Sequence, residues 1–161
     1  MADNTTVGTT LPTGSFQVTG SDKTQLALPD ELKGGWSLLY FYPKDDTPGC
    51  TKQACGYRDQ KADFDQVGLK VFGVSLDDEA SHNAFSDKFS LNFPLIVDSE
   101  KVLSEALGVF GEQTWGDKTF MGLSRDSFLI DPDGKVAYEW RKVDPIETVG
   151  DTLNKAKTLI G

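Results

Sequence analysis

Hydrophobic and polar residues alternate in two short stretches near the start of the chain, separated by a polar turn at residues 19–22. The apolar positions of the two stretches are Phe16, Val18, Leu26 and Leu28. A period of two is typical of strands with one buried face, so the pattern predicts an N-terminal β-hairpin. Residues 1–13, which are rich in Thr and Gly, are expected to be flexible.

Farther along the chain, unbroken apolar runs alternate with segments of helical spacing. Apolar runs without alternation are typical of strands buried on both faces, and apolar residues three and four apart are typical of amphipathic helices. The expected strands are 36–42, 69–76 and 93–97, and the expected helices are 48–66, 79–89 and 100–107. The segment 112–122, which contains Trp115, Phe120 and Met121, is expected to be a loop.

The C-terminal part predicts a second hairpin and a closing helix. Strands at 127–131 and 135–141 flank Asp131-Pro132-Asp133-Gly134, a sequence that favours a tight turn. The last helix has apolar residues at three- and four-residue spacing, namely Ile146, Val149, Leu153, Ala156 and Ile160. Strands that alternate with helices, followed by a hairpin and a helix, indicate one α/β domain over residues 1–161, with a mixed sheet covered on both faces.

Charge and hydropathy narrow the possible partners. The net charge of −9 argues against nucleic acid and against anionic membrane surfaces, because both bind clustered Lys and Arg. The longest apolar-rich run, residues 36–42, is too short to cross a bilayer. The first residues are polar and contain no basic side chain before Lys23, unlike a signal peptide. We therefore expect a cytoplasmic protein, in which a cysteine pair is more often catalytic than structural.

Both cysteines, Cys50 and Cys55, follow the aromatic strand within one short segment. Thr47 and Pro48 are typical of a helix N-cap and of the first helical position, so Cys50 falls in the first turn. The first backbone N–H groups of a helix lack intrahelical acceptors, and the helix dipole favours negative charge there. A thiol at this position is biased toward the thiolate, which is the nucleophilic form.

Three interpretations of the cysteine pair are open on this evidence. Both residues can be small core side chains without chemistry. A structural zinc site is a poor fit, because it needs four Cys or His ligands and the chain has two cysteines and the single His82. His82 lies in a polar helix, where we expect it to be solvated, and it is a weak candidate for a general base. The third interpretation is a nucleophile with a resolving partner.

Helix geometry makes the third interpretation specific. Residues five apart on a helix have Cα atoms about 8.6 Å apart, beyond the roughly 7 Å that a disulfide spans. A Cys50–Cys55 bond therefore requires the first turns of the helix to unwind, which would make the pair a conformational switch.

Two neighbouring residues also have two interpretations each. The Thr47 hydroxyl either accepts the backbone N–H of Cys50 as an N-cap, or it lies beside the sulfur and binds a substrate. Pro43 either ends the strand or shields the thiol from water.

The spacing Pro43-x3-Thr47-x2-Cys50 resembles the active-site signature of peroxiredoxins. The longer segment 41–51, together with Cys55, is similar to the Q-type subfamily, also called bacterioferritin comigratory proteins. Further matches follow in the same order at 72–75, 93–95, 115–116, 121–122 and 125–131. Asp126 departs from the pattern, because the family usually has a small residue after the arginine; an acid there would weaken the positive field of the site unless its side chain points away.

The resemblance implies a thioredoxin-like fold and a thiol-dependent peroxidase that acts on hydrogen peroxide and organic hydroperoxides. By this resemblance, Cys50 is the peroxidatic cysteine and Cys55 the resolving cysteine. Thr47 and Arg125 would clamp the peroxide oxygens, and Pro43 would cover the pocket. The resemblance implies no metal, haem or flavin, a thioredoxin or similar dithiol protein as reductant, and a monomer.

Two rival functions remain at this point. A thioredoxin-like disulfide reductase fits the fold, but it is expected to have C-x-x-C, whereas this chain has C-x4-C. A non-enzymatic redox sensor or holdase would use oxidation of the same thiols to expose surface.

Overall fold

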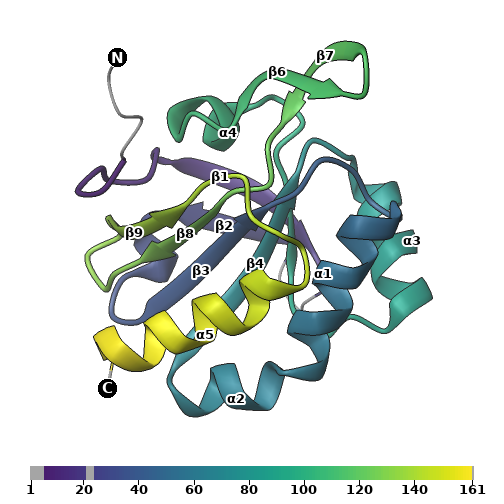
Figure 1. Cartoon of the computed structure of the whole chain (residues 1–161). Helices are drawn as coiled ribbons and strands as arrows, with labels where there is room; N and C mark the ends of the chain where they lie inside the picture. Colours follow the sequence, from purple (N-terminus) through teal and green to yellow (C-terminus); the bar gives the residue numbers. More distant parts are fainter. Residues whose placement is uncertain (1–5, 21–23, 161) are drawn as a thin grey trace.

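The computed structural model describes residues 6–20 and 24–160 as strands and helices arranged around one central sheet (Figure 1). The strands are β1 (Gly14–Thr19), β2 (Gln25–Leu28), β3 (Trp36–Phe41), β4 (Leu69–Ser75), β5 (Leu95–Val97), β6 (Phe110–Trp115), β7 (Lys118–Leu123), β8 (Ser127–Ile130) and β9 (Val136–Trp140). The helices are α1 (Pro48–Asp59), α2 (Lys61–Gln66), α3 (Glu79–Phe89), α4 (Val102–Ala106) and α5 (Glu147–Ile160), with a short 3-10 turn at Asp30–Leu32.

The central sheet is mixed, as the sequence predicts. Its strand order is β2-β1-β5-β4-β3-β8-β9. Strands β3, β4 and β5 run parallel to one another, whereas β1 and β8 pair with their neighbours in the antiparallel sense. The N-terminal hairpin β1–β2 is also confirmed, with Phe16 opposite Leu26.

Two apolar layers cover the two faces of the sheet. Alternate residues of β3 point to opposite faces, so Leu38 and Tyr40 enter one layer while Leu39 and Phe41 enter the other. The layer of Leu38 and Tyr40 contains the buried residues of α1, α2 and α5, together with Phe85 of α3. The other layer contains residues of the N-terminal hairpin and of α4. Strand β3 therefore lies in the middle of the core, and its C-terminal end leads directly into α1.

Two element predictions are wrong. The helix expected at 48–66 is two helices, because the backbone of Gln60 (φ −101°, ψ 12°) breaks the helix between α1 and α2. The loop expected at 112–122 is the β6–β7 hairpin, in which Glu112 pairs with Met121. Gly116 adopts a positive φ of 64° and closes this hairpin.

The two ends of the chain contact the rest of the molecule to different extents. Within residues 6–13, Leu11 is buried and its N–H donates to the Gly134 carbonyl at 3.0 Å, and the flexibility expected for residues 1–13 stays a prediction. Residues 1–5 lie outside the described residues. At the other end, Ile146 precedes α5 and is 61% exposed, whereas Val149, Leu153 and Ala156 are buried as predicted. None of the helices in the described part of the chain combines the length and the hydropathy needed to span a membrane.

Candidate active site

The N-terminus of α1 presents a buried thiol. Pro48 occupies the first turn and Thr47 the N-cap position, and Cys50 is 1% exposed. The capping bond, one of the two interpretations of Thr47, is absent, because the Thr47 hydroxyl donates to the Lys44 carbonyl at 3.0 Å and makes no side-chain cap contact. The helix N-terminus is thus formed as predicted, but the Thr47 side chain does not cap it.

Arg125 approaches the thiol from the other side. Its Nη1 lies 3.4 Å from Cys50 Sγ, in hydrogen-bond geometry for sulfur, and 2.9 Å from Gln53 Oε1. A Cβ atom on Gly49 would lie 3.0 Å from Arg125 Nη2, so a side chain there would crowd the guanidinium. The fold therefore brings together two residues that are 75 positions apart in the sequence.

Gln53 is a site residue that the sequence analysis missed. It lies one turn after Cys50 on α1, is fully buried and holds the Arg125 guanidinium through its carbonyl oxygen. The three-residue spacing from Cys50 is the only signal in the sequence, because residues three apart on a helix share a face.

An open groove of about 690 Å³ lies beside these residues. Its lining residues are Pro43, Thr47, Pro48, Gly49, Gln113, Thr114, Phe120, Leu123, Ser124, Arg125, Lys142 and Val143. Three of the five predicted site residues, namely Pro43, Thr47 and Arg125, thus share one groove, and Cys50 lies within hydrogen-bond distance of the third. The β6–β7 hairpin adds a wall that the sequence analysis did not foresee.

Asp126 does not face the groove through its side chain. It is 1% exposed, and its carboxylate accepts hydrogen bonds from Arg141 Nη1 at 3.0 Å, Ser124 Oγ at 2.5 Å and the Lys142 backbone N–H at 2.8 Å. Arg141 therefore neutralises the charge of Asp126, the acid that the family pattern lacks. Arg125 faces the Cys50 thiol instead.

Cys55 lies on the same continuous helix, and both cysteines are free thiols. Cys50 is buried and Cys55 is partly exposed. The helix is unbroken from Pro48 to Asp59, so the two thiols cannot form a disulfide with each other unless its first turns unwind.

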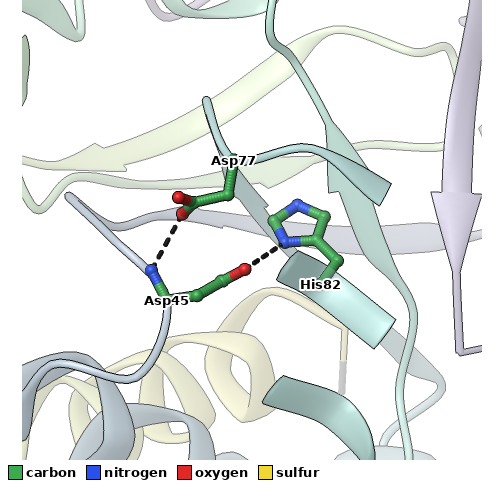
Figure 2. Close-up of side chains that lie close together, drawn as sticks. All are labelled: Asp45, Asp77 and His82. Atoms are coloured by element: carbon green, nitrogen blue, oxygen red, sulfur yellow. Dashed lines mark hydrogen bonds and ion pairs between the residues drawn. The ribbon is translucent and has the colours of Figure 1, made fainter. Parts of the chain in front are cut away.

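The prediction that His82 is solvated is wrong, because its side chain is fully buried. Figure 2 shows the ring facing Asp45, with Asp77 on the other side of that carboxylate's residue. Nδ1 lies 2.7 Å from Asp45 Oδ2, and Nε2 lies 2.9 Å from the Ile96 carbonyl oxygen. Burial by itself lowers the pKa of His82, but the hydrogen bond and the negative charge of Asp45 outweigh it and hold this pKa above its ordinary value. The polar residues around His82 in the sequence predict an exposed helix face. They do not indicate that Asp45 and the Ile96 carbonyl, which belong to other parts of the chain, bind the ring.

Asp45, Asp77 and His82 have ligand-type atoms within 4.8 Å of one another, which raises the question of a metal site. The atoms that could bind a metal ion already form hydrogen bonds within the protein. Asp45 accepts from Tyr42 and Ser81 besides His82, and Asp77 Oδ2 accepts from the Ser75 hydroxyl and the Asp45 backbone N–H. A separation of 2.7 Å between imidazole and carboxylate is a direct hydrogen bond with no room for an ion between the two atoms, so the cluster fits an ion pair better than a metal site.

Comparison with known proteins gives consistent matches. A family model described as AhpC/TSA family matches residues 7–139. Peroxiredoxin Bcp of Bacillus subtilis is 41% identical over 129 residues, which are 80% of this chain and 82% of that protein. Peroxiredoxin Bcp of Escherichia coli is 42% identical over 76% of this chain and 78% of that protein. A structure of Xanthomonas campestris peroxiredoxin Q has a TM-score of 0.87 at 34% identity and covers 98% of this chain and 100% of that chain.

Proposed function

We propose that Cys50 is the peroxidatic residue of this chain, which belongs to the AhpC/TSA family and is a thiol-dependent peroxidase of the Bcp/Q-type peroxiredoxins. The observation that carries the assignment is the 3.4 Å contact between Arg125 Nη1 and a thiol in the first turn of a helix. A helix N-terminus stabilises an anion by roughly 0.3–1 kcal/mol, and a hydrogen bond to a charged group adds about 1.5–3 kcal/mol. Arg125 is thus the larger of the two stabilising groups.

The first step oxidises the thiol. The Cys50 thiolate attacks one oxygen of the peroxide, the O–O bond breaks, and the other oxygen leaves as water or an alcohol after it takes up a proton. The sulfur becomes a sulfenic acid. Arg125 stabilises the attacking sulfur and the negative charge on the leaving oxygen, the Thr47 hydroxyl hydrogen-bonds the peroxide, and Pro43 covers one side of the groove.

The second step forms a disulfide. The thiol of Cys55 condenses with the sulfenic acid and releases water, after the first turns of α1 unwind to bring the two sulfur atoms together. An external dithiol protein, for which a thioredoxin is our proposal, then reduces the disulfide by exchange. We further propose that the protein acts as a cytoplasmic monomer.

The groove supports organic hydroperoxides besides hydrogen peroxide. Pro43, Phe120, Leu123 and Val143 give it apolar walls next to Arg125, which suits a substrate with a peroxide head and an alkyl chain. A structural study of a Xanthomonas campestris bacterioferritin comigratory protein, 34% identical to this chain, concerns alkyl peroxide reduction by that protein.

The direct test is peroxide consumption in the presence of thioredoxin, thioredoxin reductase and NADPH. We expect turnover with hydrogen peroxide and with cumene hydroperoxide, and none in Cys50→Ser. A matched Cys55→Ser variant should consume one equivalent of peroxide and then stop as a sulfenic acid. Rapid reaction with protein disulfides together with slow reaction with peroxide would instead favour the disulfide reductase.

A further inference from the structure

The turn that connects β3 to α1 is held by the helix α3, whose residues are not among those that line the groove. We call residues 42–47 the 42–47 turn. Its Asp45 carboxylate accepts hydrogen bonds from Ser81 Oγ at 2.8 Å and contacts His82 Nδ1 at 2.7 Å, and both partners belong to α3. The Tyr42 hydroxyl donates to the other carboxylate oxygen of Asp45 at 2.6 Å. The turn that carries Pro43 and Thr47 is therefore fixed through one buried carboxylate.

The two contacts of the His82 ring favour a doubly protonated ring. The Ile96 carbonyl can only accept, so Nε2 must carry a proton. Nδ1 faces a carboxylate that already accepts from Tyr42 and Ser81, so an ionised carboxylate and a second ring proton satisfy all of these contacts. The arrangement is that of a buried imidazolium–carboxylate pair, since the side chains of His82 and Asp45 are 0% and 3% exposed.

The other groups around the ring are consistent with this state. Asp77, which follows β4, is the second acid that faces His82, and its charge also favours the imidazolium. Tyr42, the first residue of the 42–47 turn, has a pKa raised well above its ordinary value by burial and by the neighbouring Tyr40 and Asp45, so it stays a neutral donor. Lys88 pairs with Asp46 at 2.8 Å on the surface, where both side chains are largely exposed.

Charge also links this pair to the reaction. Negative charge on Asp45 and on Cys50 each raises the pKa of the buried Tyr40, so both groups lie around one side chain, and a buried Asp45 carboxylate without a counter-ion would oppose the formation of a thiolate at Cys50. The imidazolium of His82 neutralises the carboxylate while it keeps the turn in place. Both effects act through Asp45, because His82 does not line the groove.

We propose that His82 is a positioning residue for the peroxidase reaction: its ion pair with Asp45 fixes the 42–47 turn against α3, so that Thr47 and Pro43 are held beside Cys50 and the buried acid is neutralised. This inference rests on the proposed function of Cys50 and adds a residue that does not touch the substrate.

The protonation state can be measured directly, because His82 is the only histidine of the chain. Long-range ¹H–¹⁵N spectra of untagged protein labelled with ¹⁵N-histidine give one pair of ring nitrogens. We expect both nitrogens to be protonated at pH 7. A neutral ring at pH 7 would overturn the proposal, and this result does not depend on peroxidase activity.

The kinetic test uses the second-order rate constant for oxidation of the thiol by hydrogen peroxide, followed by stopped-flow fluorescence. We expect His82→Gln to lower this constant by roughly tenfold to a hundredfold, because a small displacement of positioning groups has effects of that size. In Asp45→Asn/His82→Gln the buried charge is gone, so the loss should be smaller than in His82→Gln alone. Lys61→Met removes a cation that pairs with Asp65 on the surface of α2, away from the turn, and should leave the rate constant unchanged.

The pH profile separates a positioning role from a general loss of structure. In the native protein the rate constant should decrease as the pH rises through the pKa of His82, and this decrease should be absent in His82→Gln. A native rate constant in folded His82→Gln, or the same pH profile in both proteins, would overturn the proposal. If His82→Gln does not fold, the double variant gives the test. Because His82 acts through Asp45, its rate constant should be lowered as much as in Asp45→Asn alone, and a native rate constant or a further loss beyond Asp45→Asn would overturn the proposal. Failure of the proposed function is distinct, because the native protein would then show no fast oxidation.

Discussion

The 42–47 turn and the first turns of α1 lie next to each other in the sequence but are held in very different ways. The turn is fixed by the buried Asp45 carboxylate, which has one partner within the turn and two on α3, and by the Asp45 N–H, which donates to Asp77. The start of α1 has no side-chain cap, and Gly49 and Gly56 are poor helix formers that cost about 1 kcal/mol each relative to alanine. A redox switch needs both properties, a fixed segment that places the substrate groups and a helix that can unwind.

Arg125 belongs to neither the 42–47 turn nor α1, so the group that contacts the thiol lies outside the helix that is proposed to unwind. Arg125 comes from the segment before β8, so in the proposed switch it would stay with the sheet while α1 unwinds. Its bond to Gln53 on α1 is the contact that this unwinding would break. In the proposed mechanism Arg125 therefore stabilises both the reduced helix and the thiolate, and it couples the fold of the first turns of α1 to the redox state of the sulfur.

The largest expected effect on peroxide consumption comes from a substitution in α1. Cys50→Ser should lower peroxide consumption by about 10³-fold or more, because a serine hydroxyl stays protonated and cannot replace the thiolate. Steady-state turnover measures this, with the far-UV circular dichroism of the variant as the control for folding. Substantial turnover in Cys50→Ser would show that Cys50 is not the reacting residue. The contrast between the 42–47 turn and the first turns of α1 would then have no role in catalysis.

The arginine should come next. Arg125→Met removes a charged hydrogen bond worth about 1.5–3 kcal/mol and should lower the rate constant of thiol oxidation by roughly tenfold to a hundredfold. Lys52→Met, which removes an exposed cation from the same helix as Cys50, is the matched control and should react at the native rate. Equal rates in both variants would mean that Arg125 acts only as a surface charge.

Amide exchange sharpens the contrast between the two segments. After oxidation to a Cys50–Cys55 disulfide, amides from residues 47–58 should exchange about tenfold faster or more, because each lost hydrogen bond removes about 0.5–1.5 kcal/mol of net stability. The amide of Asp45, which donates to Asp77, should keep its protection. Equal protection of residues 47–58 in both redox states, or a disulfide between two chains, would rule out the local switch.

The smallest effect concerns the pH dependence of the free energy of unfolding. Burial lowers the pKa of His82 and Asp45 raises it, and the net pKa is above the unfolded value of about 6.5. The stabilisation from the pair is therefore complete below pH 6.5 and is lost as the pH rises through the folded-state pKa.

Urea unfolding at a series of pH values measures this effect. The free energy of unfolding of the native protein, minus that of Asp45→Asn/His82→Gln, should fall as the pH rises above 6.5. The control variant Lys61→Met should follow the native curve. A difference that grows with pH would show that His82 is neutral in the folded protein.

The sequence predicts most of the fold because the main elements have unambiguous patterns. The residues expected for the helix at 79–89 are those of α3, and the strand expected from residue 36 is β3. The β6–β7 hairpin was missed because the segment 112–122 lacks regular alternation, and its turn at Gly116 was interpreted as part of a loop.

The site is only partly predictable for a different reason. Cys50, Thr47 and Pro43 are close in the sequence, so the signature alone brings them together. Arg125 was placed by resemblance to a family, and the structure brings it to Cys50. His82 was interpreted as solvated because burial of a polar side chain depends on acceptors from other elements, here the 42–47 turn and β5.

The β6–β7 hairpin has a consequence for how such an enzyme can change during evolution. It forms a two-stranded sheet of its own, apart from the sheet that supports Cys50, and the Ser124 N–H closes its base by donating to the Val109 carbonyl. Its residues Gln113, Thr114 and Phe120 line the groove. Insertions or substitutions in this hairpin can therefore alter which peroxides enter the groove without disturbing the reacting thiol. Substrate range and thiol reactivity can thus change independently during evolution.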